Sequence, residues 1–398
     1  MNYIDVWMTF PDGERLVCGE IAYPAQRVKT EQGSAFRYTQ KYLAHPKAFA
    51  LDPTKLPLEP TEFVCERHLE DIHSVFEDSL PDAWGRRLLS KKYNIQIRNS
   101  RLVKLLPYLK RNGLGALSYH SKEDDNKSNS ADITSLERLI KVAQELEKGL
   151  ESDDKALALL FEAGSSPGGA RPKALVRDDN TCWLAKFPSA LDQYSMVRIE
   201  CATLTLAQQS GLSIPEHKII KCGHHEALLV KRFDVTKNNG RNHVVSMRTL
   251  LPDSFYHRYA DMADVIRQIS DHPKHDLEQM YRHMVFNALI GNTDDHDKNF
   301  SMLHGESGWK LTPAYDLLPN YGRNPEHGMS FNNNAYPPSK EELPKLGKGA
   351  FSLSSKRTET IFHEVMEPIS NWQDVFRQHH VPDDEINYFK KDITPRIS

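Results

Sequence analysis

The five-residue spacing between Asp294 and Asn299, directly after a predicted helix, restricts the fold of this chain more than any other feature. Apolar residues recur on one face over 275–289, and Gly291 marks the end of the predicted helix. Asp294 and Asn299 follow, five residues apart, and Asp316 comes seventeen residues after Asn299. In-line phosphoryl transfer needs a carboxylate that positions a hydroxyl, together with oxygen ligands for magnesium. The spacing therefore predicts a catalytic loop directly after a helix.

The length and composition predict a soluble protein of several units. A chain of 398 residues fits two or three domains with a cleft between them. Charged residues make up 26% and apolar residues 39%, and no run of about 18 apolar residues, the length that crosses a bilayer, occurs. The N-terminus lacks the basic start and the apolar run of a signal peptide. We therefore expect a cytoplasmic protein without membrane contact.

Cysteine usage and net charge argue against two kinds of site. Five cysteines without a C-x-x-C pair favour buried small side chains over disulfides or a thiolate zinc site: Cys18, Cys65, Cys182, Cys201 and Cys222. The formal net charge of -3 gives no broad attraction for nucleic acid. Any DNA contact would have to come from a local patch or a partner.

Three units are predicted along the chain, with boundaries at 1–122, 135–234 and 235–398. The first has the pattern of short strands, turns and a helix over 81–93, where a proline and an aspartate suit the first turn. The segment 120–130 is polar and lacks periodicity, which predicts a loop between the first two units.

The second and third units differ in their patterns. Leucines from Leu136 to Leu150 recur at helical spacing and predict a helix with a core-facing side. From 161 to 233 the pattern is strand-like around one helix near 200–209, a mixture that predicts a nucleotide-binding lobe. Helices dominate from Ser254 onward.

A glycine-rich segment at 164–173 is a candidate phosphate loop, because glycine lets backbone N–H groups approach phosphate closely. It has no G-K-[ST] ending and is not a Walker A motif, and glycine turns without a ligand are common. Two basic side chains, Arg171 and Lys173, favour phosphate binding. The candidate nucleotide contacts here are Ser166, Gly168, Gly169 and Lys173.

Lys186 lies on an apolar strand face, where alternation places it beside Leu184. An ammonium in such a place suits nucleotide phosphates when a carboxylate positions it. Glu200 on the following helix is the candidate carboxylate, and a surface glutamate is the alternative.

The strand that ends at Lys231 turns polar abruptly, as the hinge of a two-lobed kinase does. Lys231 and Phe233 would bind the base through the main chain, and Asp234 would accept from a ribose hydroxyl. A buried strand with an ordinary turn is the alternative.

Asp294 is the candidate base for the attacking hydroxyl, Asn299 and Asp316 are candidate magnesium ligands, and Lys298 would neutralise the transferred phosphoryl group. Alternatively, the run from Asp294 to Asp297, which includes Asp295 and His296, is a solvated turn or the metal site of a hydrolase. We favour a structural role for His296. The order of glycine loop, strand lysine, helix glutamate, hinge and catalytic loop is the one that a kinase requires.

These segments resemble the HipA family of bacterial serine/threonine kinases, the toxins of HipA/HipB-type toxin–antitoxin systems. The resemblance implies an α+β, two-lobed, atypical protein-kinase-like fold with an extra N-terminal α+β subdomain and a mainly helical C-terminal lobe. The matching stretches are 80–88, 165–174, 184–188, 231–234, 291–301 and 313–318.

The resemblance also implies ATP and Mg²⁺ as cofactors and the site roles given above. Autophosphorylation would fall on Ser166, with Ser165 beside it, and the added charge would repel nucleotide. The implied partners are a HipB-like helix-turn-helix antitoxin, which would bring the only DNA contact, and a protein substrate such as an aminoacyl-tRNA synthetase. A catalytically silent scaffold that binds an antitoxin/operator complex is the alternative function.

Three features depart from the family pattern or fall outside it. Many relatives have glutamate at the position of Lys231, and Pro167 stiffens the glycine loop. Beyond Leu318 the resemblance fades, and we expect that region to help choose the substrate.

Overall fold

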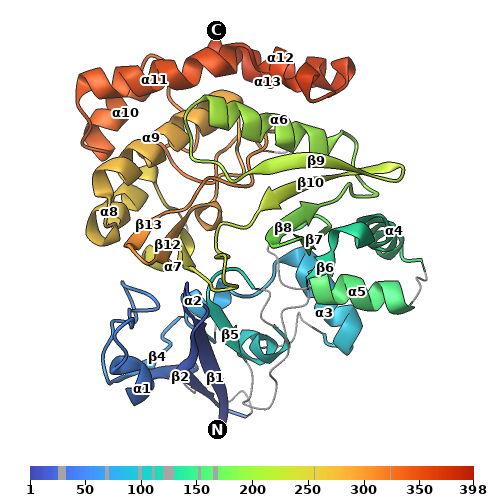
Figure 1. Cartoon of the computed structure of the whole chain (residues 1–398). Helices are drawn as coiled ribbons and strands as arrows, with labels where there is room; N and C mark the ends of the chain where they lie inside the picture. Colours follow the sequence, from blue (N-terminus) through green and yellow to red (C-terminus); the bar gives the residue numbers. More distant parts are fainter. Residues whose placement is uncertain are drawn as a thin grey trace.

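The computed structural model describes most of the chain: residues 1–25, 33–67, 71–96, 101–109, 113–119, 130–150, 154–164, 169–254, 256–322 and 324–398. Figure 1 shows three sheets that follow one another along the sequence, with most helices gathered towards the C-terminus. The predicted loop at 120–130 lies outside the described residues except for its last position.

The N-terminal sheet is antiparallel, with strand order β4-β3-β2-β1-β5. Alternate residues of its first strand, Ile4, Val6 and Met8, are buried, as period-two patterning predicts. The helix predicted over 81–93 forms α3. The elements are β1 (Asn2–Thr9), β2 (Arg15–Tyr23), β3 (Ala35–Tyr38), α1 (Gln40–Leu43), β4 (Glu62–Val64), α2 (Ser74–Glu77), α3 (Ala83–Tyr93), a 3-10 helix (Leu102–Tyr108) and β5 (Leu117–Tyr119).

The middle sheet has strand order β6-β7-β8-β10-β9 and is antiparallel except for the β6–β7 pair. Its strands are β6 (Ala131–Asp132), β7 (Lys173–Asp178), β8 (Thr181–Lys186), β9 (His217–Cys222) and β10 (His225–Lys231). Its helices are α4 (Leu136–Glu147), α5 (Asp154–Gly164) and α6 (Met196–Gln209), and a 3-10 turn (Ile133–Ser135) precedes α4.

Two details of the prediction for this region are wrong. The helix α4 ends at Glu147, and the glycine at position 149 has a positive φ of 71°, so Leu150 lies beyond the helix and is 53% exposed instead of being core. Among the cysteines, Cys182 is only partly buried because it lies near the start of β8, whereas the other four are buried.

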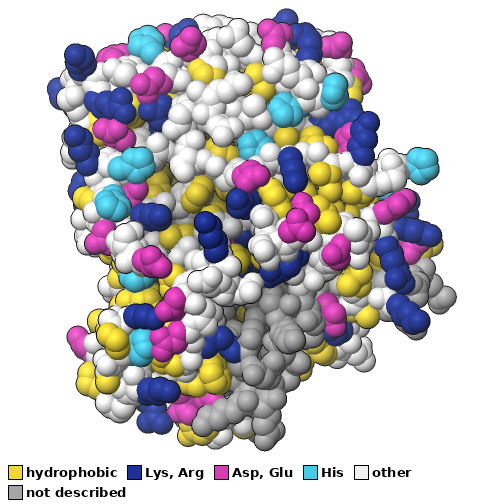
Figure 2. All heavy atoms as spheres, viewed as in Figure 1, with side chains coloured by type: hydrophobic (Ala, Val, Ile, Leu, Met, Phe, Trp, Pro, Cys, Tyr) yellow, Lys and Arg dark blue, Asp and Glu magenta, His cyan; other side chains and the backbone are white. Residues whose placement is uncertain are grey.

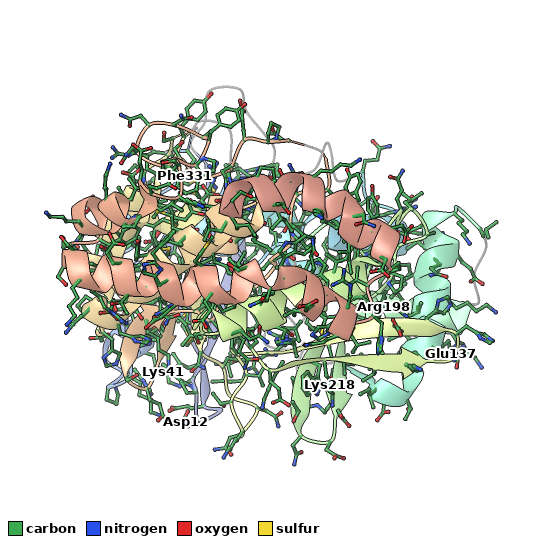
Figure 3. The ribbon with its side chains drawn as sticks, turned by 90° about the horizontal axis from the view of Figure 1, so that it is seen from above. Asp12, Lys41, Glu137, Arg198, Lys218 and Phe331 are labelled. Carbon is green, nitrogen blue, oxygen red and sulfur yellow. The ribbon has the colours of Figure 1, made fainter. Side chains whose placement is uncertain are left out.

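The C-terminal part combines a small antiparallel sheet, β11-β12-β13, with the predicted helices. The last three helices cross above α6 (Figures 1 and 3). The elements are β11 (His243–Ser246), α7 (Met247–Leu250), α8 (Tyr259–Ile269), α9 (Pro273–Ile290), a 3-10 turn (Asp297–Asn299), β12 (Ser301–Gly305), β13 (Gly308–Leu311), α10 (Leu343–Ala350), α11 (Ser355–Ser370), α12 (Trp372–Gln378) and α13 (Asp383–Ile397).

The buried apolar residues form two clusters, and these clusters do not correspond to the three sheets. The larger joins the N-terminal sheet to α6, α9 and the C-terminal helices. The smaller combines residues of the middle sheet with residues of α3, α4 and α5. Trp84 and Leu88 of α3 belong to the smaller cluster, so the N-terminal part contributes to both. The division into three units stays a prediction.

The surface has mixed charge, in keeping with the small net charge. On the face shown in Figure 2, basic side chains stand among acidic ones. No helix within the described part of the chain is long and apolar enough to cross a membrane.

Candidate active site

A cavity of about 440 Å³ is lined by residues of the N-terminal part, of the middle sheet and of the C-terminal part. Every predicted site residue that the structure describes lines this cavity: Gly169, Lys173, Lys186, Lys231, Phe233, Asp234, Asp294, Lys298, Asn299 and Asp316. Ser165, Ser166 and Gly168, together with Pro167, lie outside the described residues. Predicted site residues up to 147 positions apart in sequence, Gly169 and Asp316, therefore line one cavity.

Lys186, at the end of β8, is the centre of the charged part of the cavity. Its Nζ forms an ion pair with Glu200 of α6 and lies 2.7 Å from Oδ1 of Asp316. Burial alone would lower the pKa of Lys186, but the charges of Asp316 and Glu200 raise it above its ordinary value. The lysine is thus held charged, and the structure favours the positioned Glu200 over a surface glutamate, because Glu200 is buried.

The two carboxylates beside Lys186 differ in environment. Burial raises the pKa of Glu200, whereas the nearby charge of Lys186 holds the pKa of Asp316 well below its usual range. Asp316 has a positive φ of 57°, a conformation that aspartate adopts more readily than most residues. Its side chain is 38% exposed, so an ionised carboxylate at this place can still reach a ligand.

Lys173, on β7, is a second buried lysine in the cavity. Burial and the charge of Lys186 lower its pKa to about 8. A Cβ atom at position 169 would lie only 2.1 Å from the Nζ of Lys173, and Gly169 also has a φ of 98°. The positive φ favours glycine at this position, and any larger residue would also push the end of the Lys173 side chain aside.

The catalytic-loop candidate begins after α9, which ends at Gly291 with a φ of 74°. The side chain of Asp294 is 86% exposed. Asn299 Nδ2 donates to the backbone oxygen of Asp294 at 2.7 Å, which fixes the two predicted residues relative to each other. Lys298 accepts a hydrogen bond from the hydroxyl of Tyr315 at its backbone oxygen, at 3.0 Å.

Two further acids in this loop anchor it to the surrounding structure. Asp295 is fully buried and accepts hydrogen bonds from the Tyr259 hydroxyl and from the backbone N–H of Gly328 at 2.8 Å. Asp297 lies 3.0 Å from Nδ1 of His257. These carboxylates bind different neighbours and do not converge on one point.

The geometry therefore gives no support to the metal-hydrolase interpretation of the acidic run. Within the described ranges, no group of three or more His, Cys, Asp or Glu side chains could hold a metal ion. His296 is partly exposed, and its Nε2 lies 3.9 Å from Asp294.

The hinge candidate lies at the end of β10. The side chain of Lys231 points to Glu216, with 2.9 Å between the charged atoms. The backbone N–H of Lys231 also donates to the backbone oxygen of Glu216, at 2.8 Å, so of its main chain the backbone oxygen is the candidate contact for a base. Phe233 stacks on Tyr315 with ring centroids 5.8 Å apart. The apolar lining near this end suits an adenine ring: Leu175, Leu184, Leu204, Val230 and Val244.

Asp234 is fully buried and already bonded to protein groups. It accepts hydrogen bonds from Arg232 and from the backbone N–H of Gly115 at 2.8 Å, and Arg241 lies 3.3 Å away. Burial alone would raise the pKa of Asp234, but the charge of Arg232 lowers it. Its predicted contact with ribose stays a prediction, and in this structure its carboxylate joins the hinge to the N-terminal part.

Sequence reasoning missed the cavity residues from the N-terminal part. Asp78 and Asp82 both line the cavity, although the predicted site contained no residue before position 165. Asp78 accepts hydrogen bonds from the backbone and the hydroxyl of Ser246, and burial raises its pKa to about 6. No local pattern marks Asp78, whereas Asp82 stands in a segment that was noted only as a helix start.

Comparison with known proteins gives the same assignment along most of the chain. Residues 165–372, more than half of the chain, match the family model of the HipA-like C-terminal domain, and residues 23–120 match that of the HipA N-terminal domain. The putative kinase Y4dM of Sinorhizobium fredii is 28% identical over 268 residues, which are 61% of each chain. The serine/threonine-protein kinase toxin HipA of Shewanella oneidensis is 29% identical over 148 residues, 31% of this chain and 34% of that protein.

The chain thus spans less than two thirds of the length of these relatives. Among solved structures, the complex of Shewanella oneidensis HipA with HipB and operator DNA contains a chain that matches with a TM-score of 0.72 at 18% identity, over 99% of this chain and 96% of that chain. This likeness confirms the predicted α+β, kinase-like fold with an extra N-terminal subdomain. The chain belongs to the HipA family.

Proposed function

We propose that this chain is an ATP- and Mg²⁺-dependent serine/threonine protein kinase that acts as the toxin of a bacterial type II toxin–antitoxin system. One observation carries the proposal. Lys186 is held between Glu200 and Asp316 in the same cavity that Asp294 and Asn299 line. A silent scaffold has no need of a buried lysine positioned by two carboxylates, because burying these charges costs free energy that only a functional site has reason to bear.

The residues present fit a magnesium nucleotide. Asn299 and Asp316 offer hard oxygen ligands of the kind that Mg²⁺ prefers, and they would hold the ion. The ion would neutralise charge on the phosphates during transfer. Lys186 and Lys173 supply positive charge for the phosphates, and the N–H of Gly169 supplies a backbone donor.

Asp294 would orient the substrate hydroxyl and accept its proton as the hydroxyl oxygen bonds to the γ-phosphorus of ATP, while the bond from that phosphorus to the bridging oxygen breaks and ADP leaves. Its 86% exposure suits a hydroxyl presented by another protein, because the carboxylate can be reached from outside. Lys298 lines the same cavity and would balance charge on the transferred group. Lys231 and Phe233 would hold the base through the main chain, and Asp234 would support the ribose end.

The biological part of the proposal follows from the family. A solved relative was crystallised with HipB and operator DNA, so we propose a HipB-like antitoxin that brings the DNA contact. The substrate would be a translation-related protein such as an aminoacyl-tRNA synthetase, modified in the bacterial cytoplasm. Autophosphorylation of Ser166, or of Ser165 beside it, would switch the kinase off by placing a negative charge in the phosphate site.

The test is transfer of labelled phosphate from ATP with Mg²⁺. The wild type should label itself or an added protein, and Asp294→Asn should reduce labelling by at least about 10²-fold, the usual contribution of a general base. Asp374→Asn is the matched control, because this carboxylate is 70% exposed but lies on α12, outside the cavity. No labelling by the wild type would favour the scaffold. Phosphoproteomics after brief induction would identify the substrate.

A further inference from the structure

Asp82, in the N-terminal part, contacts the glycine-rich segment of the candidate site through its side chain. It stands at the N-cap position of α3, where an aspartate usually accepts a hydrogen bond from its own helix. Asp82 makes no such bond. Its Oδ2 instead accepts a hydrogen bond from the backbone N–H of Gly169 at 2.8 Å.

Two lysines, Lys298 and Lys173, also act on the same carboxylate. Its Oδ1 lies 3.7 Å from the Nζ of Lys298, and its charge acts on Lys173. Gly169, Lys173 and Lys298 are the groups to which the proposed function assigns the phosphates and the transferred phosphoryl group. The carboxylate of Asp82 therefore contacts the same groups that the proposed function assigns to the nucleotide phosphates.

The fold fixes the backbone on which Asp82 stands. The backbone N–H of Trp84 donates to the oxygen of Gly169 at 3.3 Å, and Trp84 Nε1 donates to the backbone oxygen of Lys173 at 3.1 Å. The indole of Trp84 is buried. The side chain of Asp82 itself is 43% exposed, so its carboxylate can turn into solvent while this backbone framework stays in place.

We propose that the carboxylate of Asp82 competes with the nucleotide phosphates for the N–H of Gly169 and the ammonium of Lys298. This inference rests on the proposed nucleotide site and adds a regulatory role for the N-terminal part. Two anions cannot share these donors without strong repulsion, so bound phosphate displaces the carboxylate. Any partner that draws Asp82 away from Gly169 would then raise nucleotide affinity.

The experiment compares nucleotide binding by wild type, Asp82→Asn and Asp178→Asn. Asparagine keeps an oxygen that accepts from Gly169 but removes the charge. Asp178 is a matched control, because its side chain is 38% exposed and it lies 3.5 Å from Lys218, away from the cavity. Lys218 is labelled on β9 in Figure 3. Titration calorimetry gives Kd for adenosine and for the Mg²⁺ complex of a non-hydrolysable ATP analogue, and a thermal melt verifies folding.

We expect Asp82→Asn to bind the triphosphate analogue roughly two- to fivefold more tightly than wild type, the size typical of a partly exposed charge pair. Adenosine should bind all three proteins equally, because it carries no phosphate, and Asp178→Asn should match wild type. The gain should shrink at high salt, since screening weakens the interaction.

Unchanged or weaker binding of the analogue by Asp82→Asn, with adenosine binding intact, overturns the inference but leaves the proposed function standing. Weaker binding would mean that Asp82 supports the nucleotide. If neither wild type nor Asp82→Asn binds any nucleotide, the proposed function fails together with the inference.

Discussion

At the scale of single residues, Lys173 makes nucleotide binding depend on pH. Its pKa of about 8 means that the folded protein loses this charge as the pH rises through 8. At pH 9 roughly one tenth of the ammonium remains, so Kd for a triphosphate analogue should weaken up to about tenfold between pH 7 and 9. Lys173→Arg should flatten the profile, because arginine stays charged. A wild-type Kd independent of pH would contradict this role.

The same pKa has a consequence for stability. The unfolded chain holds its lysine proton up to the ordinary pKa of 10.5, so it binds more protons than the folded state between pH 8 and 10.5. Lys173 therefore destabilises the fold below pH 8, and this cost falls as the pH rises through that window.

A substitution at Asp316 can distinguish a role in phosphoryl transfer from a role in folding. Asp316→Asn should abolish phosphoryl transfer by weakening a metal ligand, with a melting temperature within a few degrees of wild type. The fold should survive because Lys186 keeps its pair with Glu200, and because asparagine tolerates the φ of 57°. Alanine at this position would add backbone strain, so Asn is the cleaner variant. Loss of cooperative melting in Asp316→Asn would instead mark Asp316 as structural.

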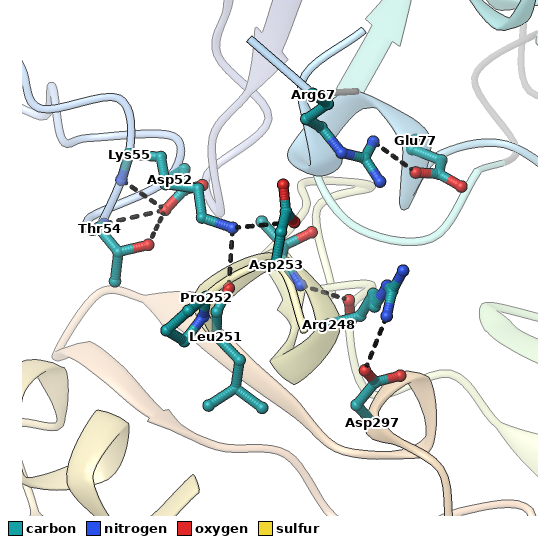
Figure 4. Close-up of polar contacts among 12 residues, drawn as sticks. Asp52, Thr54, Lys55, Arg67, Glu77, Arg248, Leu251, Pro252, Asp253 and Asp297 are labelled. Atoms are coloured by element: carbon teal, nitrogen blue, oxygen red, sulfur yellow. Dashed lines mark hydrogen bonds and ion pairs between the residues drawn. The ribbon is translucent and has the colours of Figure 1, made fainter. Parts of the chain in front are cut away.

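At the scale of elements, α7 connects the N-terminal part to the catalytic loop. Asp78 accepts hydrogen bonds from Ser246 at the start of α7, and Lys55 donates to the backbone oxygen of Leu251 just after its end, at 2.8 Å. Arg248 of α7 lies 3.5 Å from Asp297 of the loop, as Figure 4 shows. The short helix is thus held at both ends by residues of the N-terminal part, Asp78 and Lys55.

Asp78→Ala should therefore reduce both stability and transfer. It leaves the buried donors of Ser246 and Thr249 without a partner, so the free energy of unfolding should fall by about 1–3 kcal/mol in urea denaturation. The transfer rate should fall further than nucleotide affinity, because Arg248 of α7 contacts Asp297 of the catalytic loop, whereas no residue of α7 itself lines the cavity. Asp71→Ala is the control, since its partner Arg101 lies 2.7 Å away within the N-terminal part. Equal effects of both variants on transfer would refute the coupling.

The pKa of Asp78, raised to about 6 by burial, gives this element a pH signature. Between its ordinary value of 3.8 and 6 the folded state binds more protons than the unfolded chain, so its contribution to stability is lost as the pH rises through that window. In Asp78→Ala, the free energy of unfolding should lack this decrease between pH 3.8 and 6.

At the scale of the whole molecule, local patterns predicted the parts of the site but not their neighbours. Periodicity and Gly291 located α9, and strand alternation placed Lys186 on an apolar face, because both signals depend on residues close in sequence. Asp78, Asp82 and the contact between Asp234 and Gly115 depend on units that meet only in the folded chain. A sequence pattern predicts which face of a helix or strand is buried, whereas tertiary packing determines which other element that face contacts.

The shared cores predict that the whole chain unfolds as one unit. The larger cluster combines Val6 of β1 with Met284 of α9, and the smaller combines Trp84 of α3 with Trp183 of β8, so no part can leave without exposing apolar surface of another. Five tryptophans report on the chain by fluorescence. Their transition in urea should coincide with that of far-UV circular dichroism.

A nucleotide analogue with Mg²⁺ should move both transitions together, because ligand that binds only the native state stabilises everything that unfolds with the site. At a free concentration of about 100 Kd the gain in unfolding free energy should be about 2.7 kcal/mol. If the two probes separate, or if ligand moves only one of them, the N-terminal part unfolds independently. The contacts of Asp78 and Asp82 with the site would then be too weak to link the two parts.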